Sequence, residues 1–132
     1  MSTQRRLSIQ TETDASRAAL ESTQYSRALG FDETPSRLIA TAVSELARNI
    51  LKYAGTGEIR LRKVEGRRGI GIEIEAVDRG PGIEDSEAAM RDNFSSGGTL
   101  GLGLPGVKRL MDEFSLESAP GKGTRVTAVK WI

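Results

Sequence analysis

Residues 70–82 read Ile-Gly-Ile-Glu-Ile-Glu-Ala-Val-Asp-Arg-Gly-Pro-Gly, and this segment indicates the fold most directly. Apolar side chains alternate with glycine or glutamate, which predicts an antiparallel strand that is buried on one face only. The strand ends in the carboxylate of Asp78. Gly80 and Gly82 follow, and they allow positive φ angles or the close approach of a flat ligand. Taken alone, this Asp-x-Gly-Pro-Gly ending is also typical of a simple turn.

Further strands and helices are predicted on both sides of this strand. The expected strands are 6–11, two strands within 58–77 joined by a turn at 66–69, and a closing hairpin of 114–118 and 124–132. The expected helices are 14–29 with Asp14 as N-cap and Gly30 as its end, 35–54 opened by Thr34-Pro35, a short helix at 86–91, and 105–113. This order predicts an α+β fold, a two-layer sandwich in which helices cover one face of a mostly antiparallel sheet. No repeat or linker interrupts the pattern, so we expect a single domain over residues 1–132.

The composition excludes several classes of protein. Nineteen Lys and Arg balance eighteen Asp and Glu, which argues against a nucleic-acid or membrane-surface binder. Cys and His are absent, which excludes disulfides, Cys/His zinc sites, Cys nucleophiles, Ser-His-Asp triads and autophosphorylation on histidine. No apolar run approaches the roughly 20 residues that span a bilayer, and residues 1–10 lack the apolar stretch of a signal peptide. We therefore expect a cytoplasmic protein.

The long helix predicted over 35–54 carries a polar strip beside its apolar stripe. The stripe consists of Ile39, Ala42, Val43, Leu46, Ile50 and Tyr53. Glu45 and Asn49 are four residues apart and therefore lie about 40° apart around the axis, with Lys52 on the same side. A solvated helix edge has the same appearance. An asparagine in mid-helix is mildly unfavourable, however, which hints at another role for Asn49.

A glycine-rich segment precedes the last predicted helix. Residues 95–106 read Ser-Ser-Gly-Gly-Thr-Leu-Gly-Leu-Gly-Leu-Pro-Gly, and such a backbone can hold phosphates through its amides and the following helix N-terminus. A loose surface loop is the alternative. Gly101 and Gly106 have the spacing of a P-loop, but Val-Lys-Arg at 107–109 replaces the required Lys-Ser/Thr. The later Gly-Lys-Gly-Thr at 121–124 predicts a tight hairpin turn.

In this order, the four segments resemble the nucleotide-binding fold of the GHKL ATPases, which include gyrase, heat-shock chaperones, histidine kinases and mismatch-repair ATPases. The resemblance implies a Bergerat-type sandwich. Residues 43–50 (Val-Ser-Glu-Leu-Ala-Arg-Asn-Ile), 102–114 (Leu-Gly-Leu-Pro-Gly-Val-Lys-Arg-Leu-Met-Asp-Glu-Phe) and Lys130-Trp131 are similar to the RsbT-type serine/threonine kinases, the anti-sigma-factor-like kinases of the bacterial stressosome.

This resemblance implies a site for ATP and Mg²⁺. Glu45 would activate the attacking group, Asn49 would coordinate Mg²⁺ through its carbonyl oxygen, and Lys52 would neutralise phosphate charge. Asp78 would accept a hydrogen bond from the adenine amine beside Gly80 and Gly82, and Thr124 would support the same edge of the base. The segment that would close over the phosphates contributes Gly97, Gly98, Thr99, Gly101, Gly103 and Leu104. Phosphoryl transfer needs mainly positioning and charge neutralisation, so this set suffices without His or Cys.

The resemblance also implies partners. STAS-domain antagonist and stressosome scaffold proteins would receive the phosphoryl group on Ser or Thr, and the released kinase would activate a PP2C-type phosphatase. Two alternatives are a direct anti-sigma factor that sequesters a sigma subunit and a weakly catalytic, nucleotide-gated adaptor. Related kinases carry an arginine just before the lid's Gly-x-Gly, where this chain has Thr99-Leu100. Either Arg91, Lys52 or a partner group substitutes for it, or turnover is slow.

Overall fold

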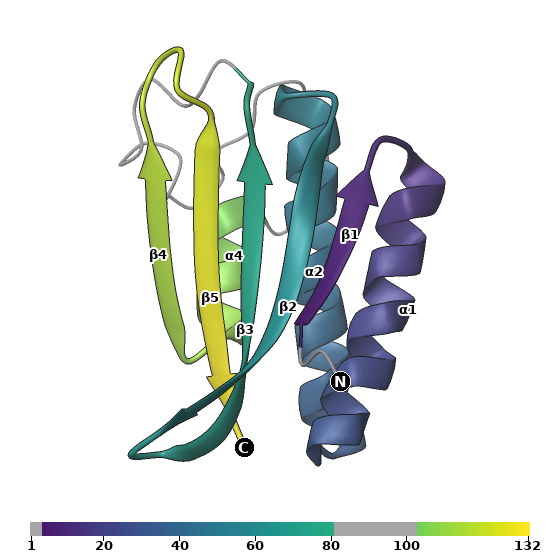
Figure 1. Ribbon diagram of the computed structural model, residues 1–132, viewed down its shortest axis with the longest axis vertical. Helices are drawn as coiled ribbons and strands as arrows, with labels where there is room; N and C mark the ends of the chain where they lie inside the picture. The colour runs from purple at the N-terminus through teal and green to yellow at the C-terminus, as the bar shows by residue number, and fades with distance from the viewer. Residues whose placement is uncertain (1–3, 81–102) are drawn as a thin grey trace.

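The computed structural model describes residues 4–80 and 103–132, and it forms a five-stranded sheet with helices packed on it (Figure 1). The elements are β1 (Gln4–Ile9), α1 (Glu12–Leu29), α2 (Glu33–Tyr53), β2 (Gly57–Gly66), β3 (Gly69–Asp78), α4 (Gly103–Leu110), β4 (Glu113–Ser118) and β5 (Thr124–Trp131). The strand order is β1-β2-β3-β5-β4, and every neighbouring pair is antiparallel.

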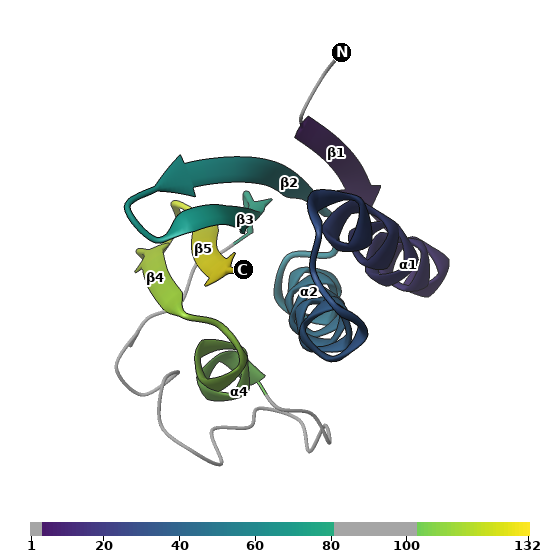
Figure 2. The same cartoon turned by 90° about the horizontal axis from the view of Figure 1, so that it is seen from below.

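The three described helices lie on the same face of the curved sheet, with α2 between α1 and α4 (Figure 2). Helix α2 contacts both of its neighbours and also β1, β2 and β3. The predicted α+β sandwich with helices on one face is therefore confirmed.

The core lies between the sheet and α2, as the sequence periodicity predicts. Alternate residues of β2, β3 and β5 point toward the helices and are buried: Ile59, Leu61, Ile72, Ile74, Ala76, Val126 and Ala128. Helix α2 contributes Ile39, Ala42, Val43, Leu46 and Ile50. Two predicted members of these apolar sets lie outside the core, because each stands at the far end of its element. Tyr53, in the last turn of α2, is 39% exposed, and Ile70, beside the β2–β3 turn, is 36% exposed.

Helix α1 begins earlier than predicted. Thr11 is its N-cap: the Thr11 hydroxyl accepts from the Asp14 backbone N–H at 3.1 Å, and the Asp14 carboxylate accepts from the Thr11 N–H at 3.1 Å. This reciprocal arrangement is a capping box, so the predicted N-cap Asp14 is instead the third residue of the helix. The predicted end at Gly30 is confirmed, since Gly30 adopts the left-handed conformation with φ of 111°.

The other helix boundaries also shift by a few residues. Helix α2 starts at Glu33 after the N-cap Asp32, which places Pro35 inside the first turn. Proline is tolerated there because first-turn amides have no partner within the helix. Helix α4 runs over Gly103–Leu110 rather than 105–113, and β4 begins directly afterwards at Glu113. The short helix expected at 86–91 lies outside the described residues.

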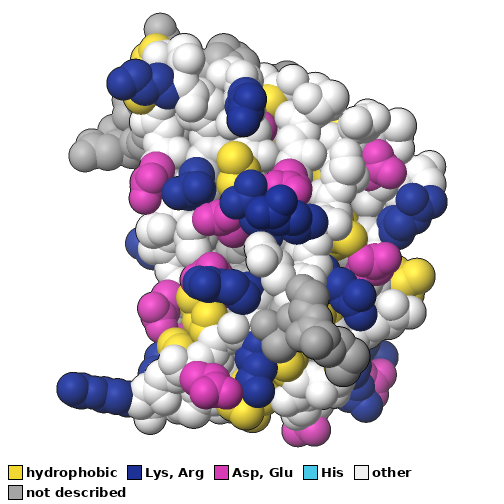
Figure 3. Space-filling view, in the orientation of Figure 1, with side chains coloured by type: hydrophobic (Ala, Val, Ile, Leu, Met, Phe, Trp, Pro, Cys, Tyr) yellow, Lys and Arg dark blue, Asp and Glu magenta, His cyan; other side chains and the backbone are white. Residues whose placement is uncertain are grey.

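The sheet face opposite the helices carries ion pairs, and Figure 3 shows basic and acidic side chains alternating over it. Arg60 donates to Glu58 at 2.7 Å and to Glu75 at 2.8 Å, and Arg62 donates to Glu73 at 2.8 Å. The hydrogen bond to Glu58 is the main cause that raises the pKa of Arg60 above its ordinary value; desolvation opposes the shift and Glu75 adds to it. Much of the basic character of β2 is thus neutralised within the sheet.

Trp131 packs on the end of this face that lies beside the β2–β3 turn. A β-carbon on Gly71 would lie 2.7 Å from the indole ring, and one on Gly66 would lie 3.1 Å from it. The indole Nε1–H donates to Glu113 at 2.6 Å. The close approach of the ring explains why glycine occupies both positions of the β2–β3 hairpin.

Within residues 4–80 and 103–132, no helix is both long enough and apolar enough to cross a membrane.

Candidate functional site

The strand register aligns Asp78 and Thr124 at one edge of the sheet. Asp78 is paired with Gly57 of β2 on one side and with Thr124 of β5 on the other, and Thr124 is paired in turn with Ser118 of β4. Asp78 follows the alternation of Ala76, and Thr124 that of Val126, so both side chains point to the helix-covered face. The structure therefore brings together two predicted adenine-binding residues that are far apart in the sequence.

Three glycines let the backbone segments meet around Asp78. An added β-carbon would lie 2.6 Å from the Val77 carbonyl oxygen at Gly57, and 2.6 Å from the Ala54 β-carbon at Gly80. At Gly123 it would lie 2.2 Å from the Asp78 carbonyl oxygen. No side chain fits at these distances. The strand ends and the C-terminal end of α2 are thus held in direct contact around this carboxylate.

The Asp78 carboxylate is oriented by its own turn. Its Oδ1 accepts from the Gly80 backbone N–H at 2.9 Å. Its Oδ2 has no hydrogen-bond partner among the residues that the structure describes. One carboxylate oxygen is therefore fixed, and the other is available to accept a hydrogen bond from a ligand.

The polar strip on α2 lies on the side of that helix nearer to α4. Ser36 lies on the opposite side of α2, toward α1, because its hydroxyl accepts a hydrogen bond from Ser26 of α1 at 2.9 Å. Asn49 lies roughly 140° around the helix axis from Ser36. Glu45 and Asn49 are half-buried, and in the described part of the chain neither side chain has a hydrogen-bond or ion-pair partner. Lys52 is exposed, and its ammonium lies 5.3 Å from the centre of the Tyr53 ring.

Helix α4 directs its N-terminus toward the same edge. At its other end, the Lys130 ammonium donates to the Leu110 carbonyl oxygen at 2.9 Å. Lys130 is paired with Ile72, so this anchor lies well down the sheet from Asp78, and α4 begins at the upper end (Figure 1). Its first turn contains no acidic residue. Such an N-terminus favours an anion, because its amides and its dipole both present positive charge.

The oxygen ligands in the described residues fit a magnesium ion that is held largely by phosphates. Among residues 4–80 and 103–132, no three or more carboxylate, His or Cys side chains form a group that could hold a metal. Mg²⁺ needs few protein oxygens when a nucleotide supplies the others, and an amide oxygen such as that of Asn49 is a suitable ligand.

The structure describes the remaining predicted site residues only in part. Gly103 and Leu104 open α4, and Leu104 is buried. The predicted residues that lie outside the described ranges are Gly82, Gly97, Gly98, Thr99 and Gly101. The position corresponding to the missing lid arginine, Thr99-Leu100, lies outside them too.

Two residues of the site were not predicted. Ser118 contacts Thr124, with 2.9 Å between their hydroxyl oxygens, and Gly57 packs against the end of β3. The predicted hairpin of 114–118 and 124–132 places Ser118 opposite Thr124, so this contact could have been found from the sequence. Gly57 could be interpreted only as a helix stop, because its close contact depends on the register of β2 with β3.

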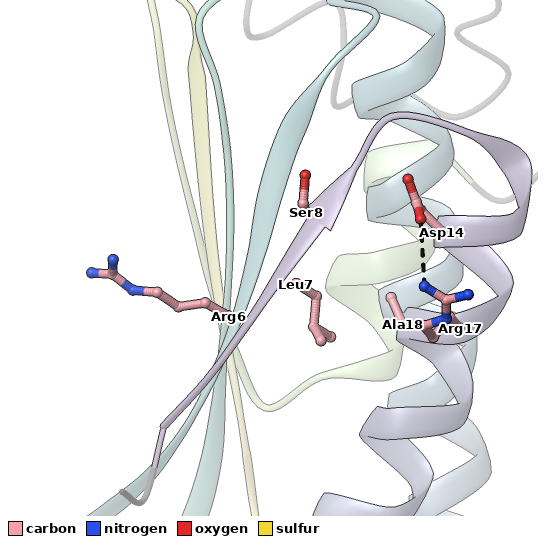
Figure 4. A pocket seen from close by; sticks show the side chains of 6 residues that line it. All are labelled: Arg6, Leu7, Ser8, Asp14, Arg17 and Ala18. Carbon is pink, nitrogen blue, oxygen red and sulfur yellow. Dashed lines mark ion pairs between the residues drawn. The ribbon is translucent and has the colours of Figure 1, made fainter.

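A separate hollow of about 240 Å³ lies between β1 and α1 (Figure 4). Its lining residues are Arg6, Leu7, Ser8, Asp14, Arg17 and Ala18. The Asp14 carboxylate there already caps α1 and lies 4.0 Å from the Arg17 guanidinium. The hollow is on the α1 side of α2 and is not part of the Asp78 edge.

Comparison with known proteins agrees with this geometry. Residues 34–131 match the family described as histidine kinase-, DNA gyrase B-, and HSP90-like ATPase. The chain belongs to this ATPase family. It is 50% identical over 124 residues to the serine/threonine-protein kinase RsbT of Bacillus subtilis (strain 168), covering 94% of this chain and 93% of that protein. It is 38% identical over 98 residues to the anti-sigma F factor of Thermoanaerobacter sp. (strain X514), covering 71% and 68%.

Two solved structures share the fold of this chain. The RsbU and RsbW domains of Rv1364c from Mycobacterium tuberculosis match with a TM-score of 0.64 at 18% identity, covering 96% of this chain and 32% of that one. The mycobacterial sensor histidine kinase MprB matches with a TM-score of 0.56 at 21% identity, covering 97% and 99%. The resemblance to GHKL ATPases that the sequence indicates is confirmed, and with it the use of ATP.

Proposed function

We propose that this chain is a Mg²⁺-ATP-dependent kinase domain over residues 1–132 that phosphorylates STAS-domain antagonist and stressosome scaffold proteins. The chain is a serine/threonine-protein kinase, since it shares 50% identity with such a kinase over nearly its whole length. The structural observation that carries the proposal is the pairing of Asp78 with Thr124. That pair stands beside the end of α2 and at the edge toward which α4 points.

The site residues that the structure describes bind different parts of the nucleotide. Asp78 Oδ2 accepts from the adenine amine, and Thr124 supports the same edge of the base. The Asn49 carbonyl oxygen binds Mg²⁺, while the first-turn amides of α4, at Gly103 and Leu104, donate to phosphate oxygens. The bound ATP supplies the γ-phosphoryl group, and Mg²⁺ neutralises phosphate charge. Lys52, at the end of α2, adds a positive charge for the phosphates.

Glu45 holds the proton that moves during the transfer. Its carboxylate accepts the proton of the partner's Ser or Thr hydroxyl as that oxygen forms its bond to the γ-phosphorus. The bond from the γ-phosphorus to the bridging oxygen breaks, which leaves ADP and a phosphorylated partner. Among the described residues, Glu45 has no hydrogen-bond or ion-pair partner, which supports this role because no such neighbour already engages its carboxylate.

Phosphorylation then separates the two proteins. A phosphate adds close to two negative charges to the partner surface and disrupts a packed interface by repulsion and desolvation. The released kinase binds and activates a PP2C-type phosphatase, which makes the domain both an enzyme and a binding switch.

Phosphoryl transfer to a purified STAS-domain partner tests the proposal. Labelled phosphate from Mg²⁺·[γ-³²P]ATP is expected on a Ser or Thr of the partner with the wild-type chain and not with Asp78→Asn. Asp32→Asn is the matched control, because Asp32 is an exposed N-cap whose side chain makes no capping hydrogen bond. Equal labelling by wild type and Asp78→Asn would contradict the proposed site.

Direct sequestration of a sigma subunit is the second candidate, since several relatives are anti-sigma F factors. A stable complex with a sigma factor in a pull-down, together with no labelling of a STAS-domain protein, would favour it. A nucleotide-gated adaptor predicts a different result, namely that an Asp78→Asn chain that binds no ATP still activates the phosphatase fully.

A further inference from the structure

Two of the contacts that Ser118 makes lie beside the Asp78 edge. Its hydroxyl oxygen lies 3.0 Å from the Gly123 carbonyl oxygen and 2.9 Å from Thr124 Oγ1. A serine hydroxyl has one hydrogen, so it can donate to only one of these two atoms. Gly123 is buried, and a carbonyl that is shielded from water needs a donor. Both contacts are hydrogen bonds only if Ser118 donates to Gly123 and accepts from Thr124.

This direction determines what Thr124 can offer a ligand. The hydrogen of the Thr124 hydroxyl is used in the bond to Ser118, which leaves only lone pairs on Thr124 Oγ1. Directly across the β3–β5 pair, Asp78 also offers only lone pairs, from Oδ2. The edge therefore presents two acceptors side by side, and it suits a ligand group that donates hydrogen bonds.

We propose that Ser118 is a positioning residue that fixes the Thr124 hydroxyl as an acceptor and so sets the preference of the site for 6-aminopurine over 6-oxopurine nucleotides. The inference rests on the proposed function, in that the purine lies against Asp78 and Thr124. An exocyclic amine donates to these acceptors. The carbonyl oxygen of a 6-oxopurine faces their lone pairs and is rejected, unless the Thr124 hydroxyl rotates to donate. Without Ser118 that rotation is free.

Nucleotide selectivity tests this role without requiring phosphoryl transfer. Calorimetry gives the dissociation constants of Mg²⁺·ATP and Mg²⁺·GTP for wild type, Ser118→Ala, Ser118→Thr and Ser115→Ala. Loss of one oriented hydrogen bond corresponds to about fivefold weaker ATP binding in Ser118→Ala, and the ratio of ATP to GTP affinity is expected to fall by at least the same factor. Ser118→Thr keeps the hydroxyl and restores the ratio. Ser115→Ala, an exposed serine on the other face of β4, behaves as wild type.

A second comparison excludes a merely structural effect. In a Thr124→Val background no hydroxyl remains to be oriented, so adding Ser118→Ala should leave the ATP-to-GTP ratio unchanged. An unaltered ratio in the single Ser118→Ala variant, or equal weakening of ATP and GTP, overturns the inference. If the ratio of ATP to GTP affinity falls in Ser118→Ala but no STAS-domain protein is labelled, the inference stands and the proposed function fails.

Discussion

The backbone carbonyl of Asp78 lies so close to Gly123 that an added β-carbon would approach its oxygen to 2.2 Å. Gly123 also has a φ of 76°, which L-residues rarely adopt. The turn after β4 is therefore seated directly on the residue that ends β3. This backbone contact adds to the strand pairing of Asp78 with Thr124 in joining the two chain segments proposed to hold the adenine.

Gly123→Ala is expected to destabilise the fold by about 3 kcal/mol or more, because overpacking against backbone adds to the strain of a positive φ. Gly121→Ala is the matched control: Gly121 has the same φ of 76° but open space around it, so only about 1 kcal/mol is expected. Urea unfolding measures both. If the free energy of unfolding falls by the same amount in both variants, the contact between Gly123 and Asp78 does not contribute to stability.

Replacing Glu45 separates catalysis from binding. Glu45→Gln keeps the size of the side chain but removes the proton acceptor, so kcat for transfer to the partner is expected to fall at least about 100-fold. The affinity for Mg²⁺·ATP should stay within a factor of about two. Glu33→Gln, on the exposed first turn of the same helix, should leave both unchanged. Wild-type kcat in Glu45→Gln would remove this residue from the mechanism.

Asn49→Ala is expected to abolish the magnesium dependence of ATP binding. Wild type should bind ATP more tightly with Mg²⁺ than with EDTA, whereas the variant should give similar affinities in both conditions because its metal ligand is missing. Calorimetry in the two buffers provides the measurement. Gln24→Ala, which removes an exposed amide from α1, should keep the wild-type difference.

Lys130→Met tests the anchor of α4. The variant loses the ammonium that donates to the Leu110 carbonyl oxygen, so the free energy of unfolding should fall by about 1 kcal/mol. If α4 holds the phosphates, ATP affinity should fall as well. Lys122→Met, in the exposed turn between β4 and β5, should change neither quantity. Unaltered unfolding of Lys130→Met would mean that packing alone fixes the helix.

The sequence predicts the buried faces best where regularly spaced apolar residues pack against one continuous surface. Alternation along residues 70–76 identified the buried face of β3, and the helical spacing of Ile39, Val43, Leu46 and Ile50 identified the face of α2 that packs on the sheet. The prediction was wrong at the ends of these patterns. Tyr53 and Ile70 continue the spacing, but each stands at the end of its element, where the described layers leave it partly exposed.

Local contacts and long-range contacts differ in how far the sequence predicts them. The capping box is a local pattern, Thr11-x-x-Asp14, which the sequence itself contains, so the prediction of Asp14 as the N-cap is wrong by only three residues. The pairing of Asp78 with Thr124 was expected only through family resemblance, because spacing along a chain does not fix the strand order β3-β5. The glycine contact between Gly57 and Val77 required the actual register, which depends on the whole sheet.

The chain has a single tryptophan, and it lies in the glycine-lined slot of the β2–β3 hairpin, at the opposite end of the sheet from Asp78 (Figure 1). Trp131 is therefore a built-in fluorophore whose emission reports on that hairpin and on Glu113. Nucleotide titrations should leave its spectrum nearly constant, while a protein that docks on the hairpin should shift or quench it. One optical signal thus separates events at the two ends of the molecule without any added label.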